Sequence, residues 1–170
     1  MLIAMELDSM LPVEQRPRYT QGYEGFFHLT EINGTVEETT MSYIIRDHDR
    51  AKFEEKKALL ASIAEFLNKK YGPVVTLELK HQYYNMRKEV EPHFFIVERA
   101  IKAIEMAGVK PKVKPIRGGT DGANLSFMGL PCPNIFAGGH NFHGKYEYVP
   151  LESMEKASEV ILNIIKLFAE

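Results

Sequence analysis

Polar side chains gather in two glycine-rich loops in the second half of the chain. One loop, at residues 115–123, has the sequence PIRGGTDGA and contains Arg117; the other, at residues 138–147, has the sequence GGHNFHGKYE and contains Asn141 and His143. A guanidinium pairs bidentately with a carboxylate, an amide donates to a carbonyl or an oxyanion, and a neutral imidazole is a good zinc ligand. These residue types indicate a ligand site, and a plain surface loop with incidental histidines is the alternative.

The two histidines of the second loop could also form a small metal site of their own. Their spacing, His140-x-x-His143, would place both on one side of a helical turn, but the flanking glycines disfavour a helix. A catalytic zinc site uses about three protein ligands, so Asp121 would have to be the third. That arrangement would make the chain a self-sufficient hydrolase, and it stays open as one interpretation.

Both loops follow short apolar segments, at residues 113–116 and 134–137, that we expect to be strands. Open α/β sheets bind their ligands beyond the carboxyl ends of the strands. A helix is expected over residues 91–108, since proline suits its first turn and glycine its end. A last helix follows the second loop, and its expected apolar face carries Leu151, Met154, Ala157, Ile161, Ile164 and Phe168. Alternating helices and strands predict an α/β layer for residues 89–170.

The first half of the chain has the order helix, strand, strand, helix, strand. The expected ranges are 1–11, 24–32, 36–46, 49–70 and 74–84. Asn33-Gly34 between the first two strands is typical of a type I′ hairpin turn. This order predicts a partial ferredoxin-like split βαβ domain at residues 1–88, with its first strand missing. The missing strand would leave an open sheet edge, through which copies of the chain could pair as a homo-oligomer.

Composition excludes several classes of protein. The 170 residues include 21 Lys and Arg against 23 Asp and Glu, so the net charge of -2 argues against a nucleic-acid partner. A single cysteine, Cys132, excludes an internal disulfide, and we expect it to be a small apolar filler. No apolar run approaches the ~20 residues of a membrane helix, and the first residues do not resemble a signal peptide. We therefore expect a cytoplasmic protein without a membrane partner.

Four long motifs extend over nearly the whole chain. They are LPVEQRPRYTQGYEGF, YIIRDHDRAKFEEKK, YYNMRKEVEPH and PIRGGTDGANLSFMGLPCPNIFAGGHNFHGKYEYVPLESMEKA. With these motifs the sequence resembles the C-terminal portion of bacterial tripeptide aminopeptidases, a family of the co-catalytic zinc aminopeptidase–carboxypeptidase superfamily. The resemblance implies a zinc-bearing catalytic domain with a smaller inserted lid. Residues 1–88 would then be most of the lid, and residues 89–170 the last α/β part of the catalytic domain.

The resemblance also implies a role for individual residues. His143 would be one metal ligand of a centre that holds two zinc ions in the complete enzyme. Arg117 and Asn141 would lie on the substrate side, and closure of the lid would bring Arg46 to the carboxylate of a small peptide. Asn85, which follows two tyrosines, would also contact the substrate. The complete enzyme would release the N-terminal residue of tripeptides.

Each substrate-binding role has a structural alternative. Arg117 could instead pair with Asp121 and order its loop, and Arg46 could pair with a neighbouring aspartate. Asn85 could cap the end of a strand, since asparagine is common at turns. The family has no need of a histidine at the place of His140, so we expect His140 to be a surface residue.

The ligands and the general base that the family has in its N-terminal half have no counterpart here. Glu37-Glu38 and Glu54-Glu55 are expected to be solvated charges rather than substitutes for them. We therefore expect no catalytic residue in this chain, no peptidase activity from the chain alone, and weak zinc binding or none. A non-enzymatic binding or oligomerisation module is the alternative function.

Overall fold

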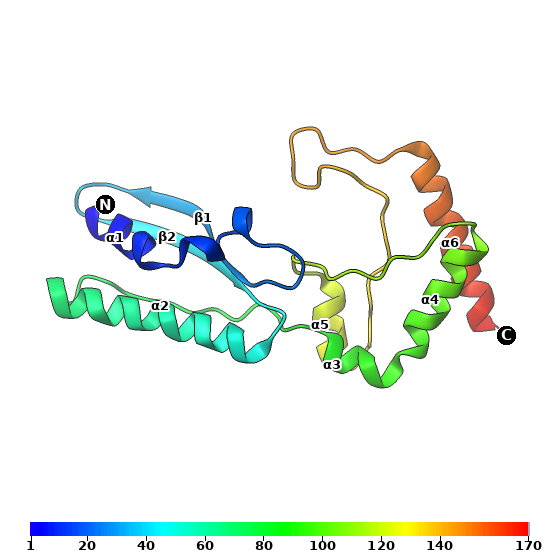
Figure 1. Ribbon diagram of the computed structural model, residues 1–170, viewed down its shortest axis with the longest axis horizontal. Coiled ribbons are helices and arrows are strands. Elements are labelled where there is room, and N and C mark those ends of the chain that lie inside the picture. The colour runs from blue at the N-terminus through cyan, green and yellow to red at the C-terminus, as the bar shows by residue number, and fades with distance from the viewer. Residues whose placement is uncertain (170) are drawn as a thin grey trace. The chain divides into compact units, whose positions relative to one another are not determined.

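The computed structural model describes residues 1–169, which fold into two compact units, each with its own core. Unit 1 comprises residues 1–85 and 114–119, and unit 2 comprises residues 86–113 and those from 120 onward. The elements in Figure 1 are α1 (Leu2–Met10), β1 (Phe26–Gly34), β2 (Thr39–Arg46), α2 (Arg50–Tyr71), α3 (Arg87–Val90), α4 (Phe95–Met106), α5 (Asp121–Phe127) and α6 (Leu151–Ala169). The mixture of helices and an antiparallel sheet confirms the expected α/β class. No helix in residues 1–169 is long and apolar enough to span a membrane. The assignment of lid and catalytic portion stays a prediction.

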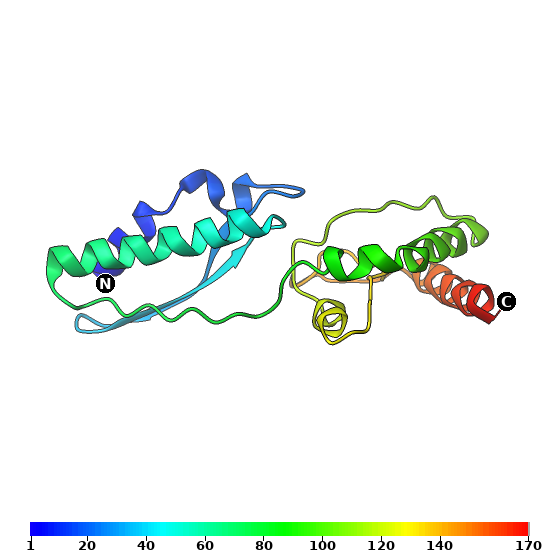
Figure 2. The same cartoon turned by 90° about the horizontal axis from the view of Figure 1, so that it is seen from below.

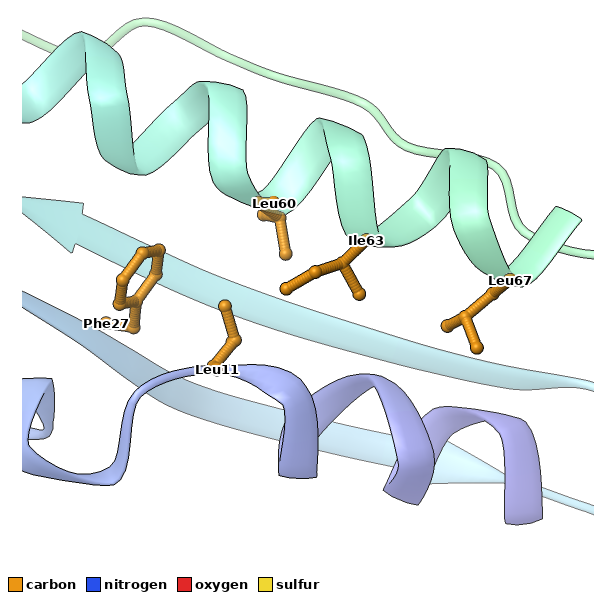
Figure 3. Packing of buried hydrophobic residues seen from close by; sticks show 5 residues of the cluster. All are labelled: Leu11, Phe27, Leu60, Ile63 and Leu67. Carbon is orange, nitrogen blue, oxygen red and sulfur yellow. The ribbon is translucent and has the colours of Figure 1, made fainter. Parts of the chain in front are cut away.

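Helices α1 and α2 of unit 1 lie on one face of the β1–β2 hairpin. Their apolar side chains meet the strands in one cluster, made of Leu11, Phe27, Leu60, Ile63 and Leu67 (Figure 3). Full burial of one such side chain contributes about 1.5–3 kcal/mol. Helix α2 begins where the sequence predicts, because the carboxylate of Asp49 accepts a hydrogen bond from the Lys52 amide.

The hairpin turn lies beyond the position that the sequence predicts. Asn33 and Gly34 both belong to β1, where Gly34 pairs with Thr39 of β2. The turn is instead formed by the next four residues, in which the Thr35 amide donates to the Glu38 carbonyl at 2.7 Å. The threonine hydroxyl also accepts from two backbone amides of this turn, which stabilises it there. The expected Asn33-Gly34 turn is therefore wrong.

The segment 74–84 is extended, but no strand among residues 1–169 pairs with it, so the expected strand is wrong as an assigned element. It runs back along α2 in both views (Figures 1 and 2). The expected strands at 113–116 and 134–137 are also irregular. A strand requires a neighbour for its backbone hydrogen bonds, and none of these segments has one among residues 1–169.

In unit 2 two helices begin at positions that the sequence does not predict. The helix expected over 91–108 begins only at Phe95, after α3 and a short 3₁₀ turn at Glu91–His93. Its end agrees with the expectation, since Gly108 follows with a φ of 73°. Helix α5 begins at Asp121, inside the segment expected to be a loop.

Helix α6 packs on α4 with a different face from the expected one. Val160 and Leu167 are buried against Ala103 of α4 and Ala107 just after it, and the Asn163 amide donates to the Ala103 carbonyl at 3.3 Å. Four residues of the expected face are exposed, namely Leu151, Met154, Ile161 and Phe168. The prediction fails because α6 is apolar on more than one side and α4 covers only one of them.

Candidate functional site

Arg46 is the last residue of β2, and neutral groups hold its guanidinium. One nitrogen, Nη2, donates to Gln82 Oε1 at 2.7 Å, and Nη1 donates to the backbone carbonyl of Ile45. The charge also lies 4.5 Å from the ring centre of Tyr83. The alternative of an ion pair with a neighbouring aspartate is wrong, because Asp47 binds a lysine and the next aspartate caps α2. The positive charge of Arg46 therefore has no acidic partner within residues 1–169.

Arg117 is held in the same manner in unit 1. Its Nη1 donates to the Thr20 carbonyl at 2.6 Å and its Nη2 to the Thr20 hydroxyl at 2.5 Å. The guanidinium lies 4.9 Å from the ring centre of Phe26. Its partner is thus Thr20, so the structural alternative of a pair with Asp121 is wrong. The third nitrogen, Nε, is buried without a hydrogen-bond partner.

Asn85 and His48 lie close to the end of β2. The side-chain amide of Asn85 donates to the His48 carbonyl at 3.3 Å, a contact that fits its structural alternative. The His48 ring nitrogen Nε2 lies 3.2 Å from the carbonyl oxygen of Ile116, and the ring stacks edge-on against Tyr23. These contacts give His48 a structural role. They also join the end of β2 to the segment that carries Arg117.

Tyr83 is a candidate site residue that residue type and spacing did not indicate. Its hydroxyl is buried without a hydrogen-bond partner, and its ring fills the space where Gly119 has no Cβ. Burial raises the pKa of Tyr83, and the nearby charge of Arg46 partly offsets this rise. The regular alternation of the segment 74–84 could have indicated that this tyrosine points inward. Unit 1 thus holds two arginines with neutral partners beside a buried phenol.

In unit 2, Asn141 and His143 lie on an exposed loop with an unusual backbone. Both have positive φ angles, 56° and 64°, which are uncommon for residues other than glycine and cost free energy. The side-chain amide of Asn141 donates to the Tyr146 carbonyl at 3.2 Å, and the His143 backbone amide donates to Glu147 Oε2 at 2.8 Å. The loop thereby fixes the backbone of His143 and leaves its imidazole exposed.

A short bridge closes the base of this loop. His140 and Tyr148 exchange two backbone hydrogen bonds, of 2.8 and 3.2 Å, and their rings are stacked with centres 5.0 Å apart. His140 is exposed, as expected. Its ring supports the base of the loop by stacking on Tyr148. The spacing of residues in the sequence does not predict this contact.

No group of three or more His, Cys, Asp and Glu side chains within residues 1–169 could hold a metal ion. The mononuclear site that His140, His143 and Asp121 could have formed is therefore not assembled. His143 can serve as one ligand, but this part of the chain does not supply a complete set. The structure describes Arg46, Asn85 and Arg117 in unit 1 and Asn141 and His143 in unit 2, and their proposed ligand-binding roles stay predictions.

Comparisons with known proteins agree on one family. A model described as Peptidase family M20/M25/M40 matches residues 13–167. The chain is 60% identical over 170 residues to "Peptidase T" of Caldanaerobacter subterraneus subsp. tengcongensis, covering 99% of this chain and 42% of that protein. It is 62% identical over 171 residues to "Peptidase T" of Alkaliphilus oremlandii, covering 100% of this chain and 42% of that protein. The chain thus spans less than half the length of these relatives and corresponds to their C-terminal portion.

Two solved structures share the fold. One is a tripeptidase from Staphylococcus aureus subsp. aureus Mu50, with a TM-score of 0.72 and 18% identity, covering 98% of this chain and 44% of that one. The other is aminopeptidase PepT from Bacillus cereus ATCC 10987, with a TM-score of 0.63 and 20% identity, covering 99% of this chain and 45% of that one. In both, the matched part is less than half of the solved chain.

Proposed function

The chain belongs to peptidase family M20/M25/M40, and from this premise we propose that it is the C-terminal portion of a zinc-dependent tripeptide aminopeptidase. The complete enzyme would release the N-terminal residue of a small peptide. The observation that carries the proposal is the identity of about 60% to Peptidase T along essentially the whole chain. The single cysteine supports a cytoplasmic location, which we also propose.

The two arginines of unit 1 are the groups that would bind the peptide carboxylate. Each is held by neutral partners, so its charge is available for an anion. A guanidinium can bind a carboxylate through two parallel hydrogen bonds. The hydrogen bonds of Arg117 to Thr20 and of Arg46 to Gln82 orient both guanidinium groups before the peptide binds. This reduces the conformational entropy lost on binding.

The loop of unit 2 would contribute to the reacting end of the peptide. Asn141 would donate to a peptide carbonyl, and Asn85 would provide a further polar contact. His143 fits as one zinc ligand because its imidazole is exposed on a loop whose backbone is fixed. Zinc, when bound, activates water and polarises a carbonyl. The remaining ligands and the general base would come from the portion of the enzyme that the relatives have in addition.

Reconstitution of the two portions tests this proposal. The chain alone, supplied with zinc, is expected to leave tripeptides intact. Mixed with the remainder of Peptidase T from Alkaliphilus oremlandii, it should release the N-terminal residue in a zinc-dependent reaction. His143→Ala should abolish this activity, while His140→Ala, which removes the other exposed histidine of the loop, should retain most of it. Zinc-dependent cleavage by the chain alone would overturn the proposal.

A non-enzymatic binding or oligomerisation module is the second candidate function. The two-stranded sheet of unit 1 favours it, since a sheet of only two strands leaves an edge on each side. Light scattering separates the two candidates. A stable homo-oligomer that stays inactive when mixed with the remainder of Peptidase T would favour the module.

A further inference from the structure

The loop of residues 138–147 leads into α6 (Figure 1), and His143 lies in it with a left-handed backbone. Its φ is 64°, and Asn141 two residues earlier has a φ of 56°. A residue other than glycine is strained in this region and stays there only where its surroundings hold it. The conformation of His143 therefore requires a stabilising contact from elsewhere in the loop.

The side chain of Glu147 supplies this contact. The His143 backbone amide donates to Glu147 Oε2 at 2.8 Å. A hydrogen bond to a carboxylate is about twice as strong as one between neutral groups. No ion pair within residues 1–169 involves Glu147, so no cation there competes with the amide for its carboxylate. The charge of Glu147 therefore acts on the backbone of His143.

The rest of the loop places this carboxylate opposite the amide. Backbone hydrogen bonds between His140 and Tyr148 close the base of the loop. Within it, the Gly144 amide donates to the Asn141 carbonyl at 2.8 Å, and the Glu147 amide donates to the Gly144 carbonyl at 3.2 Å. A Cβ at Gly144 would lie 2.8 Å from the Asn141 carbonyl oxygen, so a larger residue would disturb this turn. The turn therefore holds the carboxylate within reach of the amide.

We propose that Glu147 is a positioning residue, which fixes the direction in which the imidazole of His143 leaves the loop toward zinc. This inference rests on the proposed function, in which His143 is a zinc ligand. The backbone conformation of a residue sets the direction of its Cα–Cβ bond, so a change from left-handed to extended would turn the imidazole away. A zinc-ligating histidine is commonly oriented through its second ring nitrogen. Here a carboxylate orients the backbone from which the ring extends.

Amide hydrogen exchange of the chain without zinc measures how firmly this backbone is held. Glu147→Ala should speed exchange of the His143 amide by about tenfold or more, because the amide loses its acceptor. Glu147→Gln keeps a side-chain oxygen of similar reach and should restore part of the protection. Glu155→Ala, at an exposed position of α6, is the matched control and should leave this exchange unchanged. Unchanged exchange in Glu147→Ala would overturn the proposal, and circular dichroism verifies that each variant is folded.

The zinc affinity of the reconstituted enzyme measures the consequence for the metal. The chain is mixed with the remainder of Peptidase T from Alkaliphilus oremlandii, and competition with a chelator gives the dissociation constant of zinc. Glu147→Ala should weaken zinc binding by about 10- to 100-fold, as is typical when a group that orients a metal ligand is removed. Glu147→Gln should weaken it less, and Glu155→Ala should leave it unchanged. A purely structural role would lower stability in Glu147→Ala without a change in zinc affinity, which would overturn the proposal.

The variant His143→Ala separates failure of this proposal from failure of the proposed function. Reduced zinc affinity in His143→Ala with unchanged affinity in Glu147→Ala would leave the proposed function standing and contradict the positioning role. Unchanged zinc affinity in His143→Ala would contradict the proposed function, because His143 would then not be a ligand, and with it the role of Glu147 toward zinc.

Discussion

At the scale of single residues, the pairing of Arg117 with a neutral partner leads to a prediction about substrate charge. In the reconstituted enzyme, Arg117→Ala should lower kcat/KM for a free tripeptide by about 10- to 150-fold, equal to the about 1.5–3 kcal/mol of a charged hydrogen bond. The loss should nearly vanish for the same tripeptide with an amidated C-terminus, because no carboxylate is then present. Arg18→Ala, whose guanidinium lies near Tyr19, is the matched control and should affect neither substrate. An equal loss for both substrates would contradict carboxylate binding.

Tyr43 is the residue that gives stability a dependence on alkaline pH. Its hydroxyl donates to Asp8 at 2.5 Å, and Arg16 lies 2.9 Å from the same carboxylate oxygen. Burial, followed by the hydrogen bond to Asp8, raises the pKa of Tyr43 above its ordinary value of 10.0. The unfolded chain therefore releases this proton first, so the stabilisation is complete below about pH 10 and is lost as the pH rises beyond it.

Removal of the Tyr43 hydroxyl should lower stability and weaken its pH dependence. Tyr43→Phe should reduce the free energy of unfolding by about 1–3 kcal/mol at pH 7, because Asp8 loses a donor in a partly buried place. Above pH 10 the variant should lose less stability than the unchanged chain. Urea titrations at several pH values measure both effects. Tyr19→Phe at an exposed position is the control, and the same pH profile in all three proteins would refute this assignment.

At the scale of elements, the register of the hairpin makes Gly34 a steric requirement rather than a turn residue. A Cβ at Gly34 would lie 2.5 Å from the Oγ1 atom of Thr39 on the opposite strand. Gly34→Ala should therefore lower the free energy of unfolding by about 1–3 kcal/mol through overpacking. Thr39→Ala alone should change the free energy of unfolding little, because the Thr39 hydroxyl is buried without a hydrogen-bond partner. The double variant should recover most of the loss, and additive effects would instead favour the turn that the sequence predicts.

Elements with their own periodicity are predictable from this sequence, and elements that need a distant partner are not. The apolar repeat and the cap at Asp49 are sufficient to define α2. The segment 74–84 has the alternation of a strand, but the ladder requires a neighbour that residues 1–169 do not supply. The candidate site also has a part that the sequence predicts and a part that it does not. The chemistry of Arg117 follows from its type, whereas its partner Thr20 lies 97 residues away and has no signal in the sequence.

At the scale of the whole molecule, each unit keeps a small core and leaves a large apolar surface. In unit 2 the side of α6 that faces away from α4 exposes Leu162 at 58% and Ile165 at 60%. Contiguous apolar surface of this kind marks a place of contact with other polypeptide. The relatives are more than twice as long as this chain, and if the proposed function holds, their additional polypeptide would cover this surface.

This apolar surface should make the isolated chain associate with itself. A single charged side chain introduced into the surface should reduce that self-association. Ile165→Lys is expected to lower the self-association seen by light scattering, because an exposed lysine is hydrated and replaces an apolar contact. Its free energy of unfolding should change by no more than about 0.5 kcal/mol, since position 165 contributes nothing to the core. Val160→Ala on the buried side of α6 is the opposite control. It should lower the free energy of unfolding by about 1–3 kcal/mol and leave the self-association of the folded chain unchanged. If the same surface also binds the remainder of Peptidase T, Ile165→Lys should weaken that complex as well. Undiminished self-association in this variant would show that the chain associates through another surface, and the open edges of the β1–β2 sheet would then be the place to test.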